Sequence, residues 1–271
     1  MTIFDQMVAR YEIHSDKDRK NAIFETMQEI ALAGLFRGGF FNHAAFYGGT
    51  CLRVFYGMTR FSEDLDFSLI HEDPNFRLED FFPAIINEFM AAGREVLITK
   101  KEKSTPRRVE SAFLKDNTEI YNVSFRTEKI IKIKIEVDTD PPLGFNTEQK
   151  LLLNPFSFMT RCFALPDLFA GKMHALVFRS WKSRVKGRDW YDFEWFVRKG
   201  VKLNFPHLQA RMEQFNHVVM SREQFMAKLK ERLAATDIDM VKRDVLPFVK
   251  NPGELEIWSN DYFLQLADLI Q

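Results

Sequence analysis

The chain has 271 residues, of which 46% are hydrophobic and 28% are charged, and its 38 basic side chains balance 38 acidic ones. A chain this apolar and without net charge is not intrinsically disordered. It contains no apolar run of about 18 residues that could span a bilayer, and residues 1–20 have no signal-peptide core. Its 2 cysteines stand near no histidine cluster, which predicts neither a disulfide framework nor a zinc site. We therefore expect a soluble, cytoplasmic protein.

Predicted helices and strands alternate in the first half of the chain. Apolar residues at helical spacing predict a helix over 18–36, and Gly48-Gly49-Thr50 opens a short second helix. Leu65, Phe67 and Leu69 alternate with polar residues, so 62–70 is predicted to be a half-buried strand. A helix is predicted over 78–93. Further strands are predicted over 95–100, 109–114, 120–126 and 131–138, the last with strict alternation of aliphatic and charged residues.

The pattern changes after Pro141 and Pro142, where strand signals fade and helical patterns follow. Helices are predicted over 166–182, 189–199, 205–217, 221–234, 237–249 and 258–270. We therefore expect an α+β fold, in which an N-terminal α/β domain with a mixed sheet precedes a C-terminal α-helical domain. The boundary is placed near 150–164, which divides the chain into residues 1–155 and 156–271.

The most informative constellation is a glycine turn followed by two aspartates on one strand face. Asp64 and Asp66 lie side by side on the predicted strand, and their mutual repulsion is costly unless a cation relieves it. Mg²⁺ prefers carboxylate oxygens together with substrate phosphates. Gly48-Gly49 and the following helix N-terminus can bind a phosphate, and the Thr50 hydroxyl adds a donor. Taken singly, the aspartates also fit a solvated strand face and the glycines an ordinary turn.

A third carboxylate is expected from the charged face of 131–138, which offers Glu136 and Asp138. We prefer Glu136, because Asp138 stands at the strand end beside the Pro-Pro turn. Lys134 shares this face and could neutralise phosphate or orient the carboxylate. The alternative is an edge strand that is kept soluble by its charges.

Basic side chains are concentrated in residues 150–200, where ten Lys and Arg face four acidic residues. This segment is either a phosphate-binding wall or a solvated basic face. Within it, Lys172 shares a helix stripe with Arg179 and can face a cleft, or else it snorkels at a domain interface. Asp189 begins the next helix and is expected to order Lys172. Arg188 and Asp192 have the four-residue spacing of a surface ion pair.

The stretch 46–69, FYGGTCLRVFYGMTRFSEDLDFSL, resembles the first motif of the AbiEii/AbiGii toxin family, a branch of the polymerase-beta-like nucleotidyltransferases. Three further blocks follow in the family's order, so the resemblance spans about 46–196. They are Lys134-Ile135-Glu136, the helix with Lys172, and the segment with Arg188, Asp189 and Asp192. The chain departs from the family at Thr50, where many superfamily members have serine, and at Gly171, which interrupts the Lys172 helix.

This resemblance implies a nucleotidyltransferase that transfers NMP from an NTP to an acceptor and releases pyrophosphate. Asp64, Asp66 and Glu136 are expected to hold two Mg²⁺ ions when NTP is bound, with Lys172 as a further catalytic residue. The expected nucleotide-binding residues are Gly48, Gly49, Thr50, Ser62, Lys134, Lys172 and Asp189. The helical domain is expected to contribute to the nucleotide and acceptor cleft.

The family further implies the toxin of a bacterial type IV-like toxin–antitoxin system, with tRNA as acceptor, a cognate antitoxin as partner and no membrane association. RNA is expected to contact the basic 150–200 segment, where Lys182, Arg184 and Lys186 could follow its backbone. Two alternatives remain open. The acceptor could be a protein side chain, or the chain could act as a catalytically weak, nucleotide-dependent binding partner.

Overall fold

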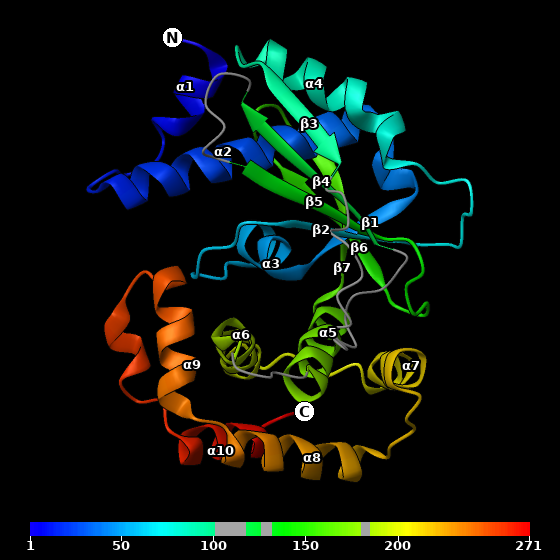
Figure 1. Ribbon diagram of the computed structural model, residues 1–271, viewed down its shortest axis with the longest axis vertical. Helices are drawn as coiled ribbons and strands as arrows, with labels where there is room; N and C mark the ends of the chain where they lie inside the picture. The colour runs from blue at the N-terminus through cyan, green and yellow to red at the C-terminus, as the bar shows by residue number, and fades with distance from the viewer. Residues whose placement is uncertain (101–117, 126–131, 180–184) are drawn as a thin grey trace.

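The computed structural model describes residues 1–100, 118–125, 132–179 and 185–271. A mixed sheet with its covering helices occupies one end of the molecule, and the helices from residue 165 onward gather at the other (Figure 1). Within the described residues the sheet has seven strands in the order β3-β4-β5-β2-β1-β7-β6. They are β1 (Ala44–Tyr47), β2 (Leu65–Leu69), β3 (Val96–Lys100), β4 (Thr118–Phe125), β5 (Lys132–Asp138), β6 (Thr147–Leu152) and β7 (Phe158–Phe163).

Strands β1, β2 and β5 form the centre of the sheet. Strand β2 runs antiparallel to β1 and parallel to β5, and this pairing sets Asp66 beside both Tyr47 and Glu136. In β5 the aliphatic residues Ile133 and Ile135 are fully buried, whereas the residues between them are partly exposed. The alternation predicted for 131–138 is therefore confirmed, and the charged face of β5 is left open for a site.

Helices of the first half pack on this sheet. They are α1 (Ile3–Val8), α2 (Asp16–Arg37), α3 (Gly48–Tyr56) and α4 (Phe82–Ala91), with the 3-10 turns η1 (Phe40–Asn42) and η2 (Leu78–Phe81). Ser15 caps α2 by accepting a hydrogen bond from the Asp18 amide. Helix α2 contacts β5, β7 and α4, and Gly34 permits the close approach to α4, because a Cβ there would lie 2.6 Å from the Ile85 Cα.

The second half is helical, with α5 at its centre. Its helices are α5 (Leu165–Phe178), α6 (Gly187–Arg198), α7 (Phe205–Asn216), α8 (Arg222–Ala235), α9 (Ile238–Val245) and α10 (Asn260–Asp268), with the turns η3 (Leu246–Phe248) and η4 (Pro252–Leu255). Helix α5 packs against α6 on one flank and α7 on the other (Figure 1). Across the described ranges, no helix is both long and apolar enough to cross a membrane.

The predicted α+β class, with a mixed sheet and a helical second half, is confirmed, and each of the six helices predicted after residue 164 corresponds to one of α5–α10. The prediction that strands end before Gly144 is wrong. Strands β6 and β7 carry the sheet to Phe163, which lies within the region 150–164 where the boundary was placed. Strand β6 alternates between exposed and half-buried residues, which leaves no apolar period to detect. The strand predicted over 109–114 lies outside the described residues.

Candidate active site

The glycine turn between β1 and α3 lies against the residues that lead into β2. Gly48 has a left-handed φ of +82°, and a Cβ at this position would lie 2.3 Å from Asp66 Oδ2. A Cβ at Gly49 would lie 2.7 Å from Ser62 Oγ and 2.9 Å from Arg60 Nη2. Both positions therefore exclude a side chain, and the backbone of the turn packs closely against Asp66, Ser62 and Arg60.

Two buried side chains hold the segment in front of β2. The Thr50 hydroxyl donates a hydrogen bond of 2.5 Å to the Asp64 carbonyl. The Gln28 amide, on α2, donates to the carbonyls of Ser62 and Glu63 at 3.0 Å each. This buried hydroxyl positions Asp64, and the expected contact of Thr50 with a phosphate stays a prediction.

Three carboxylates meet beside this turn. Asp66 and Glu136 are register neighbours on β2 and β5, and Asp64 lies immediately before β2. The Lys134 Nζ lies 3.2 Å from Asp64 Oδ2 and 2.9 Å from Glu136 Oε1. Burial, together with the negative charges of Glu136 and Asp64, raises the pKa of Asp66 to about 7. The fold thus brings together the carboxylates singled out in the sequence and concentrates negative charge at Asp66.

The donor set suits a divalent cation, although the arrangement of its side chains does not yet form a metal site. Among the described residues, no group of three or more His, Cys, Asp or Glu side chains has the geometry to hold a metal ion. The Lys134 ammonium lies between Asp64 and Glu136, where a cation would bridge them. The carboxylate oxygens are the ligands that Mg²⁺ prefers, and the raised pKa of Asp66 reflects an excess of negative charge that a cation would relieve.

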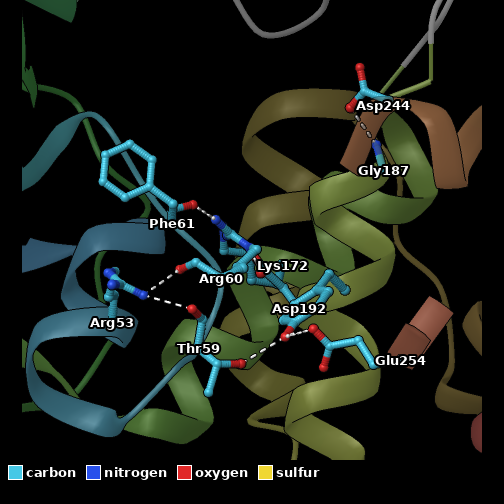
Figure 2. A network of polar contacts seen from close by, with 10 residues as sticks. Arg53, Thr59, Arg60, Phe61, Lys172, Gly187, Asp192, Asp244 and Glu254 are labelled. Carbon is cyan, nitrogen blue, oxygen red and sulfur yellow. Dashed lines mark hydrogen bonds and ion pairs between the residues drawn. The ribbon is translucent and has the colours of Figure 1, made fainter. Parts of the chain in front are cut away.

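A buried ion triad adjoins the glycine turn and joins the two halves of the chain (Figure 2). Arg60, from the segment between α3 and β2, donates to Asp192 of α6 through Nε at 2.6 Å and Nη2 at 2.7 Å. The Lys172 Nζ, on α5, lies 2.7 Å from Asp192 Oδ2. Although burial raises it, the two cations hold the pKa of Asp192 well below its usual range. Gly49, Arg60, Asp192 and Lys172 are therefore linked in one continuous chain of contacts.

The segment that carries Arg60 is held on both sides, as Figure 2 shows. The Arg53 guanidinium donates to the Thr59 carbonyl at 2.7 Å and to the Arg60 carbonyl at 3.2 Å. The Thr59 hydroxyl lies 2.7 Å from the Tyr191 hydroxyl, which donates to Glu254 at 3.2 Å. These contacts restrict the direction in which Arg60 reaches across to α6.

The contacts of α6 differ from those expected from the sequence. Asp189 was expected to order Lys172, but it pairs with Arg179 at 3.0 Å, and Asp192 orders Lys172 instead. The surface pair expected between Arg188 and Asp192 is also wrong, because Asp192 is fully buried and the Arg188 guanidinium lies over the Phe248 ring. The cause is the orientation of α6, which turns Asp192 toward Arg60.

Gly171 leaves α5 uninterrupted, so Lys172 keeps its helical register. Arg60 was missed, although it lies inside the quoted 46–69 block, because no spacing within the sequence connects it with Asp192. Three basic residues of 150–200 are paired with carboxylates, Lys172 with Asp192, Arg179 with Asp189 and Lys150 with Glu148. Burial lowers the pKa of Lys186 to about 8. Lys182 and Arg184 lie outside the described residues.

Comparison with known proteins identifies the family of this chain. Residues 30–270 match the model of the family described as nucleotidyl transferase AbiEii toxin, type IV TA system. The chain belongs to this family and is a nucleotidyltransferase. No curated protein matches the sequence.

Two solved structures are similar in fold. MenT4, a nucleotidyltransferase toxin from Mycobacterium tuberculosis, has 17% identity over 100% of both chains and a TM-score of 0.53. JHP933 from Helicobacter pylori has 17% identity over 94% of this chain and 92% of its own, with a TM-score of 0.52.

The Asp192→Ala variant is expected to lose roughly 3–5 kcal/mol of unfolding free energy, because it leaves two cations unpaired at a buried position. Urea unfolding measures this loss. Arg198→Ala is the matched control, because Arg198 is 68% exposed and its contact with Glu194 is worth well under about 1 kcal/mol. If Asp192→Ala does not fold, Asp192→Asn takes its place, and a loss no larger than that of the control would contradict the role given to the triad.

Stability of the metal-free protein should depend on pH through Asp66. Its raised pKa means that the native state binds this proton more tightly than the unfolded state, so ionisation of Asp66 destabilises the native state as pH rises toward 7. Asp66→Asn should therefore raise the unfolding free energy by about 1–3 kcal/mol at pH 8, with the gain shrinking toward pH 4. Thermal unfolding without divalent ions, with the exposed Glu72→Gln as control, measures it. A gain that is independent of pH would contradict the assignment.

Proposed function

We propose that this enzyme transfers NMP from an NTP to the end of an RNA acceptor, with Mg²⁺ held by Asp64, Asp66 and Glu136. One observation carries the proposal: the three carboxylates, the Gly48-Gly49 turn and the Arg60–Asp192–Lys172 triad meet at the junction of the sheet and the helical half. Carboxylates for a cation and donors for phosphate are both needed for nucleotidyl transfer, and this junction supplies them together.

The triphosphate is assigned to the side of the glycine turn. Backbone N–H groups at the start of α3 favour an anion. The Arg60 guanidinium lies against Gly49, and Asp192 holds it together with Lys172. Charge-assisted hydrogen bonds from these two cations to phosphate oxygens are stronger than neutral ones, which supports this side for the leaving pyrophosphate.

Bound divalent cations would supply Lewis-acid stabilisation of the attacking and leaving oxygens. Lys134 is the residue whose contacts would change, because its ammonium now neutralises part of the negative charge of Asp64 and Glu136. With a divalent cation bound at these carboxylates, Lys134 would be available to donate to a phosphate oxygen. Glu136 completes the carboxylate set and can accept the proton of the acceptor hydroxyl.

Membership of the AbiEii family supports a toxin that is neutralised by an antitoxin in the cytoplasm. RNA, and tRNA in particular, is favoured as the acceptor by the resemblance of the 46–196 blocks and by the basic excess of residues 150–200. Asp189, which pairs with Arg179 next to this region, stays a nucleotide-binding prediction.

Transfer is tested with the purified chain, each labelled NTP in turn, Mg²⁺, and either total tRNA or a protein extract. The wild type should label tRNA, and Asp64→Ala or Asp66→Ala should reduce the rate at least about 100-fold, because a metal-bound transition state loses several kcal/mol without a ligand. Glu72→Gln is the control and should keep full activity. Full activity in both aspartate variants would contradict the metal assignment, and label on protein alone would replace the RNA acceptor with a protein one.

Lys134→Met should bind a divalent cation more tightly than the wild type in the absence of nucleotide. The substitution removes the positive charge that competes for Asp64 and Glu136, and leaves three carboxylates without a counter-ion. Calorimetric titration with Mn²⁺ measures this, and Lys132→Met, on the exposed start of the same strand, is the matched control. Unchanged or weaker Mn²⁺ binding in Lys134→Met would show that Lys134 does not occupy the cation position.

A further inference from the structure

A second basic group lies beside the carboxylates, on the flank of α5 that faces away from the triad. Arg211 projects from α7 toward α5, and a Cβ at Gly171 would lie 3.9 Å from the Arg211 Cζ. Arg211 makes no hydrogen bond or ion pair with any described residue, and its Nε is buried without a partner. The Phe215 ring, 5.2 Å away on the same helix, is the cation–π contact that the structure gives it.

The surroundings of Arg211 place it next to the site. Tyr47 and Asp138 lie near it at the ends of β1 and β5, and the Asp138 carboxylate favours its charge. Tyr47 pairs in register with Asp66, and Asp138 lies two residues beyond Glu136. Arg211 thus lies at the same strand ends as the carboxylates.

No neighbouring group on α7 neutralises or shares this charge. His207, one helical turn earlier, is 2% exposed and has no hydrogen bond at either ring nitrogen. Burial lowers the pKa of His207 to about 3, so the imidazole is neutral at physiological pH. Arginine does not deprotonate in proteins, and the half-buried Arg211 keeps a partly desolvated charge with no hydrogen-bonded anion at its buried Nε. The position therefore favours an anionic ligand.

Helix α5 separates this cation from the triad. Successive residues of a helix point about 100° apart, so Lys172 reaches Asp192 on α6 while Gly171 faces Arg211 on α7. Helices α6 and α7 lie on opposite flanks of α5 (Figure 1). In phosphoryl transfer the attacking and leaving oxygens are roughly in line on opposite sides of the phosphorus. If pyrophosphate leaves toward Lys172 and Arg60, the acceptor must approach from the Arg211 side.

We propose that Arg211 binds a backbone phosphate of the RNA acceptor, the one next to the ribose whose hydroxyl attacks, and so positions the acceptor opposite the triphosphate. This inference rests on the proposed function for the direction of attack. Arg211 is a binding residue of the acceptor and takes no part in holding the NTP. A guanidinium suits this ligand, because its planar array of donors can contact two phosphate oxygens at once.

The test compares Arg211→Gln and Arg211→Lys with the wild type in three measurements. They are the KM for tRNA during transfer, the Kd for NTP by calorimetry, and the Kd for tRNA without nucleotide as a function of salt. Arg211→Gln should raise both tRNA constants about 10- to 100-fold, as expected for a lost charge-assisted contact, and should reduce the salt slope by about 0.7. Its NTP affinity and melting temperature should not fall, and Arg211→Lys should recover part of the tRNA affinity.

Arg243→Gln is the matched control, because it removes one exposed positive charge from α9 without touching α7. It should leave the KM for tRNA unchanged. A lower NTP affinity in Arg211→Gln with an unchanged KM for tRNA would assign Arg211 to the nucleotide and overturn the proposal. Equal tRNA binding by Arg211→Gln and the wild type would overturn it as well.

Failure of the proposed function can be told apart from failure of the Arg211 proposal. In the first case the wild type neither binds NTP nor transfers NMP to tRNA. The nucleotide-free tRNA measurement still decides the role of Arg211 in that case. Loss of tRNA affinity in Arg211→Gln, but not in Arg243→Gln, would support an RNA phosphate site. If the wild type binds no tRNA and labels protein instead, the RNA assignment is overturned.

Discussion

One fully buried carboxylate, Asp192, determines how the sheet and the helical half of this chain meet. It receives two hydrogen bonds from Arg60 and an ion pair from Lys172, which come from different halves of the sequence. Burying three charges has a large desolvation cost, which only close, multiply hydrogen-bonded geometry offsets. Any rotation of α6 against the sheet would break that geometry, so the relative position of the halves is tied to the site itself. The same contacts hold two cations beside the Gly49 turn.

A second constraint is the repulsion among Asp64, Asp66 and Glu136. The register of β2 against β5 brings Asp66 and Glu136 together. Asp66 is also packed against Gly48, because its Oδ2 occupies the space that a Cβ of residue 48 would take, and this limits its movement away from Glu136. Lys134 relieves part of the repulsion, and the pKa of Asp66 stays raised. The site therefore stores unfavourable electrostatic energy that a bound cation would release. This arrangement is consistent with a cluster that is stable without ligand and that could bind the proposed divalent ion.

The two flanks of α5 are chemically different, and this difference gives the site a direction. Lys172 and Arg60 share a carboxylate on one flank, whereas on the other flank the Arg211 Nε has no hydrogen-bond partner among the described residues. A cation that is already paired can hold a phosphate that must later leave. An unpaired cation is suited to a ligand that arrives with its own charge. The transferred group would lie between these two environments, above Asp66 and Glu136.

The sequence by itself determined the elements with a strong local signal and the residue types of the site. Strict alternation in 131–138 predicted β5, helical periodicity predicted α5–α10, and the repulsion of Asp64 and Asp66 predicted a cation-seeking strand face. Strands β1, β6 and β7 were not predicted, because β1 has only four residues, β6 is an edge strand, and β7 buries the polar Thr160, so none has a clear apolar pattern of its own. The sequence also did not identify the partner of Lys172 or the positions of Arg60 and Arg211 at the site. An ion pair between residues 132 positions apart, and a buried arginine Nε without a hydrogen-bond partner, depend on how helices turn against a sheet, and only the tertiary structure decides that.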